Sequence, residues 1–137
     1  MRIRRALETI RALWTMVVIE AGLRTTDLPT TCRRLRVGLD LKSATPPVLD
    51  VAVLPRKTRA AMWAAKAVAS RWPAGDTCLR RCLLVGHRLR ALDPVLRIGV
   101  KRGADGAFAA HSWLEIHGRT LDPTASEYAV LSWPGES

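Results

Sequence analysis

Residues 95–122 read VLRIGVKRGADGAFAAHSWLEIHGRTLD, and their alternation of apolar and polar side chains decides the fold. The period of two over 96–101 predicts one β-strand, and the same period over 107–116 predicts a second. The glycine-rich stretch 103–106 predicts the turn between them. Two adjacent strands joined by a short turn indicate an antiparallel pair.

The ribbon is expected to continue beyond the second strand. His117 and Gly118 predict a tight turn, since both residue types tolerate a positive φ. A third strand is then expected over 119–122, and a fourth over 127–133. This part of the chain therefore predicts an antiparallel meander.

The segments before this meander predict helices. Apolar side chains recur every three to four residues over 3–24, and further helices are expected over 29–35, 55–71 and 76–91. Residues 37–55 contain three prolines and predict a connector with little regular structure. Helices followed by an antiparallel sheet define the α+β class. We expect one compact domain, with a helical N-terminal segment and connector at 1–54 and the core at 55–137.

Two features of the helices predict packing. Trp63 and Trp72 are expected to pack inward. The helix over 3–24 carries an apolar stripe, which is typical of a face buried in the core. A helix that binds a membrane surface or a partner is the alternative. The stripe consists of Ile3, Leu7, Ile10, Leu13, Trp14, Val17, Val18 and Ala21.

Composition limits the classes of protein to which the chain can belong. With 137 residues and 48% hydrophobic residues it can bury one core without disulfides. The net charge of +10 indicates an acidic partner. No spanning segment or signal peptide is recognisable, so a cytoplasmic location is expected. The sequence contains no Asn and no Gln, which excludes a Cys-His-Asn triad and a Gln-based oxyanion hole.

Cys78 is the strongest candidate nucleophile among the three cysteines. It falls in the first turn of the helix expected over 76–91, where Asp76 or Thr77 can cap the backbone. Free N–H groups and the helix dipole at such a position favour the thiolate. Cys82 lies one turn further into the helix and is interpreted as a small core residue. Cys32 has no candidate catalytic residue near it in the sequence.

The expected hairpin places a histidine beside a carboxylate. If His117 and Gly118 are the central turn residues, Asp122 pairs with Trp113 across the ribbon, and both share a face with His111. His111 and Asp122 then become diagonal neighbours within side-chain reach. Glu115 faces the same side but lies about 13 Å from His111 along the strand, so it is a poor orienter.

A zinc site is a competing interpretation of the same atoms. Cys78, Cys82 and one histidine would supply three ligands. The cysteines have helical i, i+4 spacing, however, and the chain has no second cysteine pair. A catalytic thiol is the better interpretation.

Several motifs resemble the lasso-peptide leader peptidases, a family of transglutaminase-like cysteine proteases. They are Cys78-Leu79-Arg80-Arg81, Gly99-Val100, Phe108 to Glu115, Gly118 and Leu121-Asp122. The resemblance covers about residues 55–133. The C-L-x-R, A-H-x-W-x-E and L-x-D motifs appear in the family's order and at its spacing, while Ser112 stands where alanine is more usual.

The resemblance implies a transglutaminase/papain-like core and a function. Cys78 would be the nucleophile, His111 the general base and acid, and Asp122 the orienter. The substrate would be a ribosomally made precursor peptide, cut between leader and core, with no cofactor or metal. The partners would be a separate leader-binding protein and an ATP-dependent lasso cyclase, and we expect the basic segment 1–36 to contact the leader-binding protein or the leader.

Two other classes of function are still open. A transglutaminase-type acyl transferase would use the same triad with an amine in place of water. A non-catalytic nucleic-acid binder would use the positive charge, but the sequence has one Phe and one Tyr and shows no base-stacking motif. Nucleic acid is therefore not an expected partner.

Overall fold

The computed structural model describes residues 2–41, 52–75, 77–122 and 129–130. The helices are α1 (Arg2–Thr25), α2 (Leu28–Leu35), α3 (Arg59–Ser70) and α4 (Cys78–Arg88), with 3₁₀ turns η1 (Arg56–Thr58) and η2 (Arg90–Leu92). The strands are β1 (Gly38–Leu39), β2 (Val95–Arg102), β3 (Phe108–Ile116), β4 (Arg119–Thr120) and β5 (Ala129–Val130). The expected α+β class is confirmed.

The sheet has β2 and β3 at its centre. Its strand order is β1-β2-β3-β4, and β5 pairs with β2 on the side away from β3. The β2–β3 and β3–β4 pairs are antiparallel, as the expected meander requires. β5 is also antiparallel, but it pairs with β2 and not with β4, so the meander does not extend to the fourth strand. β5 confirms part of the fourth strand expected over 127–133, and the rest of that segment lies outside the described residues.

The segment expected to be an irregular connector contains a short strand. Gly38 and Leu39 form β1, which runs parallel to β2 opposite Val95 and Leu96. A two-residue strand is too short to produce a periodic pattern, so the sequence carries no signal for it. Residues 42–51 of the connector lie outside the described residues.

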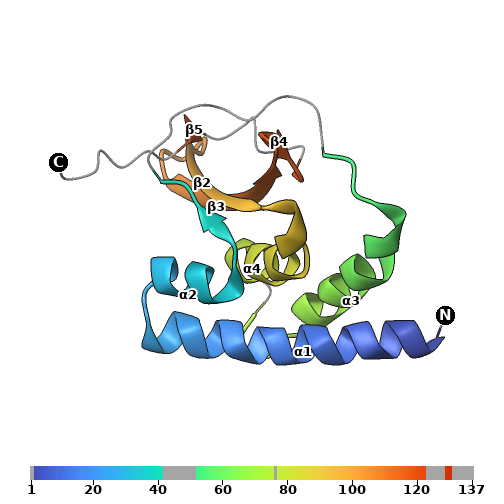
Figure 1. The fold of residues 1–137 in the computed structure, drawn as a ribbon. Coiled ribbons are helices and arrows are strands. Elements are labelled where there is room, and N and C mark those ends of the chain that lie inside the picture. Colours follow the sequence, from blue (N-terminus) through green and yellow to red (C-terminus); the bar gives the residue numbers. More distant parts are fainter. Residues whose placement is uncertain (1, 42–51, 76, 123–128, 131–137) are drawn as a thin grey trace.

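The helices form a layer on one face of the sheet. Figure 1 shows α1 along the base of the molecule, with α2, α3 and α4 between α1 and the sheet. α4 packs directly against β3, and the core between them includes the buried Leu83, Leu96 and Leu114. Gly86 permits this close approach, because a Cβ there would lie 2.9 Å from Val37 and 3.3 Å from Leu114.

Two ion pairs fasten α1 to α4. The buried Glu8 accepts hydrogen bonds from Arg88 Nε and Nη2, both at 2.8 Å. One end of Glu20 accepts from Arg80 Nε at 2.8 Å, and Arg80 Nη2 reaches its other oxygen at 3.2 Å. Two-point contacts between a guanidinium and a carboxylate fix orientation as well as distance. The long N-terminal helix is therefore anchored along its inner side.

Two packing expectations are wrong. Trp63 is 48% exposed and lies under the Arg5 guanidinium, 5.0 Å from the ring centroid, although Trp72 does pack against the core. The apolar stripe of α1 faces solvent, and the opposite side of the helix is buried instead. That inner side is built mainly from small or flexible residues that pack closely, namely Glu8, Ala12, Met16, Ile19 and Gly22.

Candidate active site

The structure places Cys78 at the N-terminal end of α4. Thr77 is the N-cap residue, and its hydroxyl accepts the backbone N–H of Arg80 at 3.2 Å. Thr77 thus takes the capping role expected of either Asp76 or Thr77, and Asp76 lies outside the described residues. The N–H groups of the first helical turn have no intrahelical acceptor, so this end of α4 stabilises negative charge on the thiol.

The hairpin between β3 and β4 has the expected register. Glu115 pairs with Thr120 and Ile116 with Arg119, which leaves His117 and Gly118 as the turn residues with φ of 53° and 76°. Leu121 N–H donates to the Leu114 carbonyl at 2.9 Å, so the ribbon continues to the residue before Asp122.

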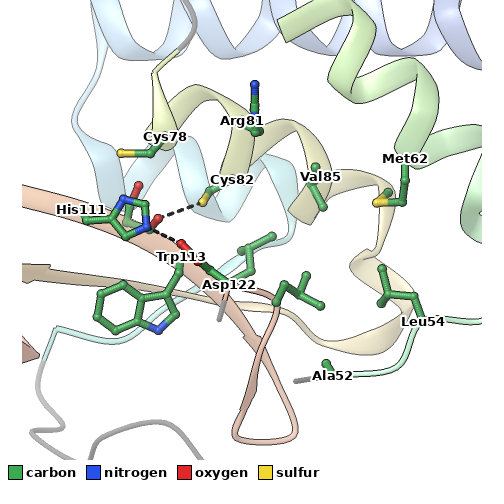
Figure 2. A pocket seen from close by; sticks show the side chains of 13 residues that line it. Ala52, Leu54, Met62, Cys78, Arg81, Cys82, Val85, His111, Trp113 and Asp122 are labelled. Carbon is green, nitrogen blue, oxygen red and sulfur yellow. Dashed lines mark hydrogen bonds and ion pairs between the residues drawn. The ribbon is translucent and has the colours of Figure 1, made fainter. Parts of the chain in front are cut away.

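This register brings His111 and Asp122 together. His111 Nε2 is hydrogen-bonded to Asp122 Oδ2. The bond leaves Nδ1 as the ring nitrogen for the thiol. Figure 2 shows the imidazole between the Cys78 and Asp122 side chains. Cys78, His111 and Asp122 all line one pocket, so the three residues singled out from the sequence meet at one site.

Thr120 fixes the position of Asp122, and the sequence did not predict this role. Its buried hydroxyl accepts the Asp122 backbone N–H at 2.9 Å and donates to the Asp122 carbonyl at 2.9 Å. This double contact fixes the backbone from which the carboxylate projects. A threonine at the end of a hairpin is common, so the sequence alone offers no signal for this role.

The electrostatics favour an ion pair between the thiol and the imidazole. Partial burial opposes ionisation of Cys78, but hydrogen bonds from Ser112 and the hydrogen bond and charge of His111 outweigh it, so the pKa of Cys78 lies below its ordinary value. Burial opposes protonation of His111, but hydrogen bonds to Asp122 and Cys78 raise its pKa above the usual range. The two shifts together widen the pH window in which thiolate and imidazolium coexist.

The other cysteines have the opposite character. Burial raises the pKa of Cys82 to about 12 and that of Cys32 to about 11. The Cys82 thiol donates to the Ser112 carbonyl at 3.5 Å, one helical turn below Cys78. Cys32 is buried, and Cys82 is half-buried against the core, in agreement with the prediction that Cys82 is a small packing residue.

Trp113 and Glu115 form a buried support beside the imidazole. The indole Nε1 of Trp113 donates to Glu115 Oε2 at 2.8 Å, and Arg97 Nη1 donates to Glu115 Oε1 at 3.3 Å. The rings of His111 and Trp113 have centroids 6.2 Å apart. Glu115 therefore orients the tryptophan rather than the histidine, in agreement with its expected distance from His111.

Ser112 is the second residue whose role the sequence did not indicate. Its side chain is buried, and its Oγ has no partner at hydrogen-bond distance among the described residues. Ser112 is nevertheless one of the polar groups near Cys78 that lower the pKa of that thiol.

The site opens into a pocket of about 620 Å³. One end holds the reactive groups, and Figure 2 shows Leu54 and Met62 at the other end. Arg81 and Cys82 also line the pocket, and the rest of its lining away from the reactive groups is apolar, namely Ala52, Leu54, Met62, Val85, Leu114 and Leu121. Such a pocket can take an apolar side chain of a substrate whose reacting carbonyl lies at Cys78.

The remaining histidines lie outside this pocket. His87 Nδ1 contacts the Leu35 carbonyl at 2.8 Å, and His117 occupies the hairpin turn. Within the described part of the chain, no three side chains of His, Cys, Asp or Glu are grouped so that they could hold a metal ion. The chemistry that the described residues support is nucleophilic attack by a thiolate with an imidazole as acid and base.

Comparison with known proteins agrees with this chemistry. A model of the transglutaminase-like superfamily matches residues 13–132, which include α4, the hairpin and the second half of α1. Searches of curated proteins and of solved structures found no match. Proteins of this superfamily are generally enzymes, either cysteine proteases or acyltransferases. The chain belongs to the transglutaminase-like superfamily.

Proposed function

We propose that the chain is a cysteine protease that removes the leader from a ribosomally made lasso-peptide precursor. The observation that carries the proposal is the meeting of Cys78, His111 and Asp122 at one pocket, with the imidazole bonded to the carboxylate. The motifs around these residues resemble those of lasso-peptide leader peptidases, which supplies the substrate class. Cleavage would free the core N-terminus for an ATP-dependent cyclase.

The first half of the reaction is acylation of Cys78. The thiolate attacks the scissile carbonyl at the leader–core junction and forms a sulfur–carbon bond. His111 then donates its proton to the departing amine as the carbon–nitrogen bond breaks. Asp122 holds the ring in the required orientation through Nε2 and stabilises the imidazolium before the transfer.

The second half is hydrolysis of the thioester. The neutral His111 accepts a proton from water, and the resulting hydroxide equivalent attacks the thioester carbonyl. The carbon–sulfur bond breaks, the leader leaves as a carboxylate, and Cys78 returns to the thiolate paired with imidazolium. Because the sequence has no Asn or Gln, the oxyanion depends mainly on backbone donors.

The N-terminal end of α4 provides such donors. The Arg80 N–H is already bonded to the Thr77 hydroxyl, whereas the N–H groups of Cys78 and Leu79 belong to the first helical turn and have no acceptor within the helix. The Cys78 N–H is adjacent to the attacked carbonyl by necessity. Loss of one oxyanion donor typically costs about 2.7–4 kcal/mol of barrier.

The experiment is cleavage of the full precursor by the purified chain together with the leader-binding protein, followed by mass spectrometry. The proposal predicts two peptides whose masses sum to the precursor plus one water, and none with Cys78→Ala. A product in which an amine is joined to the acyl fragment would instead identify an acyl transferase. An intact precursor with the wild-type chain under these conditions would contradict the proposed function.

The nucleic-acid alternative has its own discriminating measurement. A gel shift that weakens steeply with salt and is unchanged by Cys78→Ala would favour a charge-driven nucleic-acid binder. The proposed peptidase predicts no such shift at physiological salt, because its site is a pocket lined by the triad and mainly apolar side chains, with Arg81 as the one arginine or lysine among the described residues of the lining.

A further inference from the structure

The outer side of α1 exposes a row of large apolar side chains. Ile10 is 62% exposed and Trp14 is 70% exposed, although both lie in the middle of a 24-residue helix. The spacing within the row alternates between four and three residues, as in a helix face that packs against another helix. The residues with this spacing are Ile3, Leu7, Ile10, Trp14 and Val17. We call this exposed row the outer face of α1, and it consists of Ile3, Leu7, Ile10, Leu13, Trp14 and Val17.

This exposure is not explained by the packing of α1 within the fold. The helix is already held by its inner side, where Met16 and Ile19 are fully buried and Glu8 and Glu20 pair with arginines of α4. A solvated outer side would ordinarily be polar, and contiguous apolar patches of this kind mark interaction sites. The outer face therefore has a binding role that the isolated chain leaves unfilled.

The charge around the outer face is one-sided. Both acidic residues of α1 turn inward, since the side chains of Glu8 and Glu20 are only 6% and 13% exposed. Arg11 and Arg24 each pair with one of these glutamates, yet their side chains remain 65% and 70% exposed. Arg4 and Arg11 flank Leu7 at helical spacings of three and four residues. A complementary partner would combine an apolar groove with acidic residues along its rim.

We propose that the outer face of α1 is the docking surface for the separate leader-binding protein. The identity of this partner rests on the proposed function, while the apolar, acid-rimmed chemistry of its surface rests on α1 itself. Figure 1 shows α1 at the base of the molecule, with the helical layer between it and the sheet. A protein bound there leaves the pocket beside β3 open for the leader–core junction.

A second copy of the chain fits this surface less well. Each chain has a net charge of +10, so pairing two copies through α1 would bring two basic rims together. A membrane surface is the other apolar, acidic candidate. No helix in the described part of the chain is long and apolar enough to cross a membrane. Cations lie on both flanks of the outer face, Arg4 and Arg11 on one and Arg2 and Arg24 on the other, so an anionic lipid surface is kept as an outcome of the test.

The test measures the affinity of the purified leader-binding protein for three forms of the chain by titration calorimetry. The variant is Ile10→Ser combined with Trp14→Ser, and the matched control is Phe108→Ser. Phe108 is 71% exposed, nearly the same as Trp14, but lies on β3. We expect the double variant to bind at least about 30-fold more weakly, and the control to bind within about twofold of wild type. Binding of the wild type should weaken as salt is raised.

Equal affinity of the double variant and the wild type would overturn the proposal. The proposal would also be overturned if the double variant lost binding to vesicles of anionic lipid but kept its affinity for the leader-binding protein. Loss of self-association in sedimentation, with that affinity unchanged, would overturn it as well. Thermal unfolding of the double variant should match wild type, because the substituted side chains are exposed.

A second readout separates this proposal from the proposed function. Cleavage of a short peptide that spans only the leader–core junction should be equal for the wild type and the double variant, since the pocket is untouched. Cleavage of the full precursor with the leader-binding protein should fall for the double variant alone. If the wild type cleaves neither substrate, the proposed function fails, and the affinity measurement still decides the docking surface.

Discussion

The junction of α4 with β3 and the outer face of α1 treat their side chains in opposite ways. At the junction, ionisable groups are drawn into a pocket where each contacts another: Cys78, His111 and Asp122. On α1, large apolar side chains such as Ile10 and Trp14 are exposed to solvent, while Glu8 and Glu20 face the interior. Each region departs from the rule of polar outside and apolar inside, and such departures are expected where a protein performs a function. The first departure indicates chemistry, and the second indicates association.

Replacing Cys78 gives the sharpest test of the first region. We expect Cys78→Ala to lower kcat/KM for precursor cleavage by about 10⁵-fold, because the nucleophile is removed. Cys82→Ala, four residues along the same helix, should stay within about threefold of wild type, because the Cys82 thiol is half-buried and its pKa is raised to about 12. Mass spectrometry of timed reactions measures both rates. Equal losses for the two variants would mean that the first helical turn does not select the nucleophile.

Replacing Asp122 tests how the imidazole is held. Asp122→Asn should lower kcat by about 10³-fold with little change in KM, because the amide cannot stabilise the imidazolium or fix its tautomer. Asp93→Asn is the matched control, since Asp93 is an exposed carboxylate in a left-handed turn that asparagine also adopts. A loss of less than about tenfold would show that the carboxylate does not act through His111.

The residues of the junction were predictable because a hairpin has few geometries. Once His117 and Gly118 are taken as the turn, the pairing of Ile116 with Arg119 follows, and so does the side on which His111 and Asp122 project. Cys78 was predictable because a helix start is marked by a capping residue. Ser112 and Thr120 were not, because their hydroxyl groups act through contacts that only the folded arrangement shows.

The orientation of α1 was not predictable in the same way. The 3.6-residue period correctly marks an amphipathic helix, but it does not say whether the apolar side meets this chain or another one. The buried side of α1 consists of the small residues Ala12 and Gly22, the apolar residues Met16 and Ile19, and two carboxylates. The arginine partners of these carboxylates lie on α4. Those partners lie 60 and 80 residues away in the sequence, so the pattern within the helix contains no trace of them.

The two sides of α1 can be compared by truncating one residue on each. Met16→Ala should lower the free energy of unfolding by about 2–5 kcal/mol, because Met16 is fully buried and its loss leaves a cavity. Trp14→Ala should change the free energy of unfolding by less than about 0.5 kcal/mol, since its ring is exposed. Chemical denaturation measures both. If Trp14→Ala were the more destabilising change, the outer face would belong to the core.

Acid should weaken the attachment of α1 to α4. Hydrogen bonds from Arg80 lower the pKa of Glu20 from 4.5 to about 2, and those from Arg88 lower the pKa of Glu8. Because both pKa values are lower in the folded chain, this stabilisation is complete above about pH 4.5 and is lost as the pH falls toward 2. Melting temperatures between pH 7 and pH 2 measure it. Glu20→Gln should cost about 1 kcal/mol at pH 7 and flatten the acid dependence, whereas an unchanged slope would show that Glu20 is not coupled to folding.

The smallest expected effect is at Ser112. Ser112→Ala should lower kcat/KM by no more than about tenfold near neutral pH, because a polar group that lowers the pKa of Cys78 is lost. The acid limb of the pH–rate profile should move to higher pH, as the pKa of Cys78 rises. A lower rate with an unmoved acid limb would mean that the hydroxyl serves packing instead of the thiolate.

The pairing of Cys78 with His111 can be measured without any substrate. The rate of alkylation by iodoacetamide is followed against pH, and the modified residue is identified by peptide mass. We expect Cys78 to react rapidly at neutral pH while Cys32 and Cys82 do not, and we expect His111→Ala to raise the apparent pKa of Cys78 toward that of a free thiol. A Cys78 that titrates as an ordinary thiol and is indifferent to His111→Ala would contradict the account.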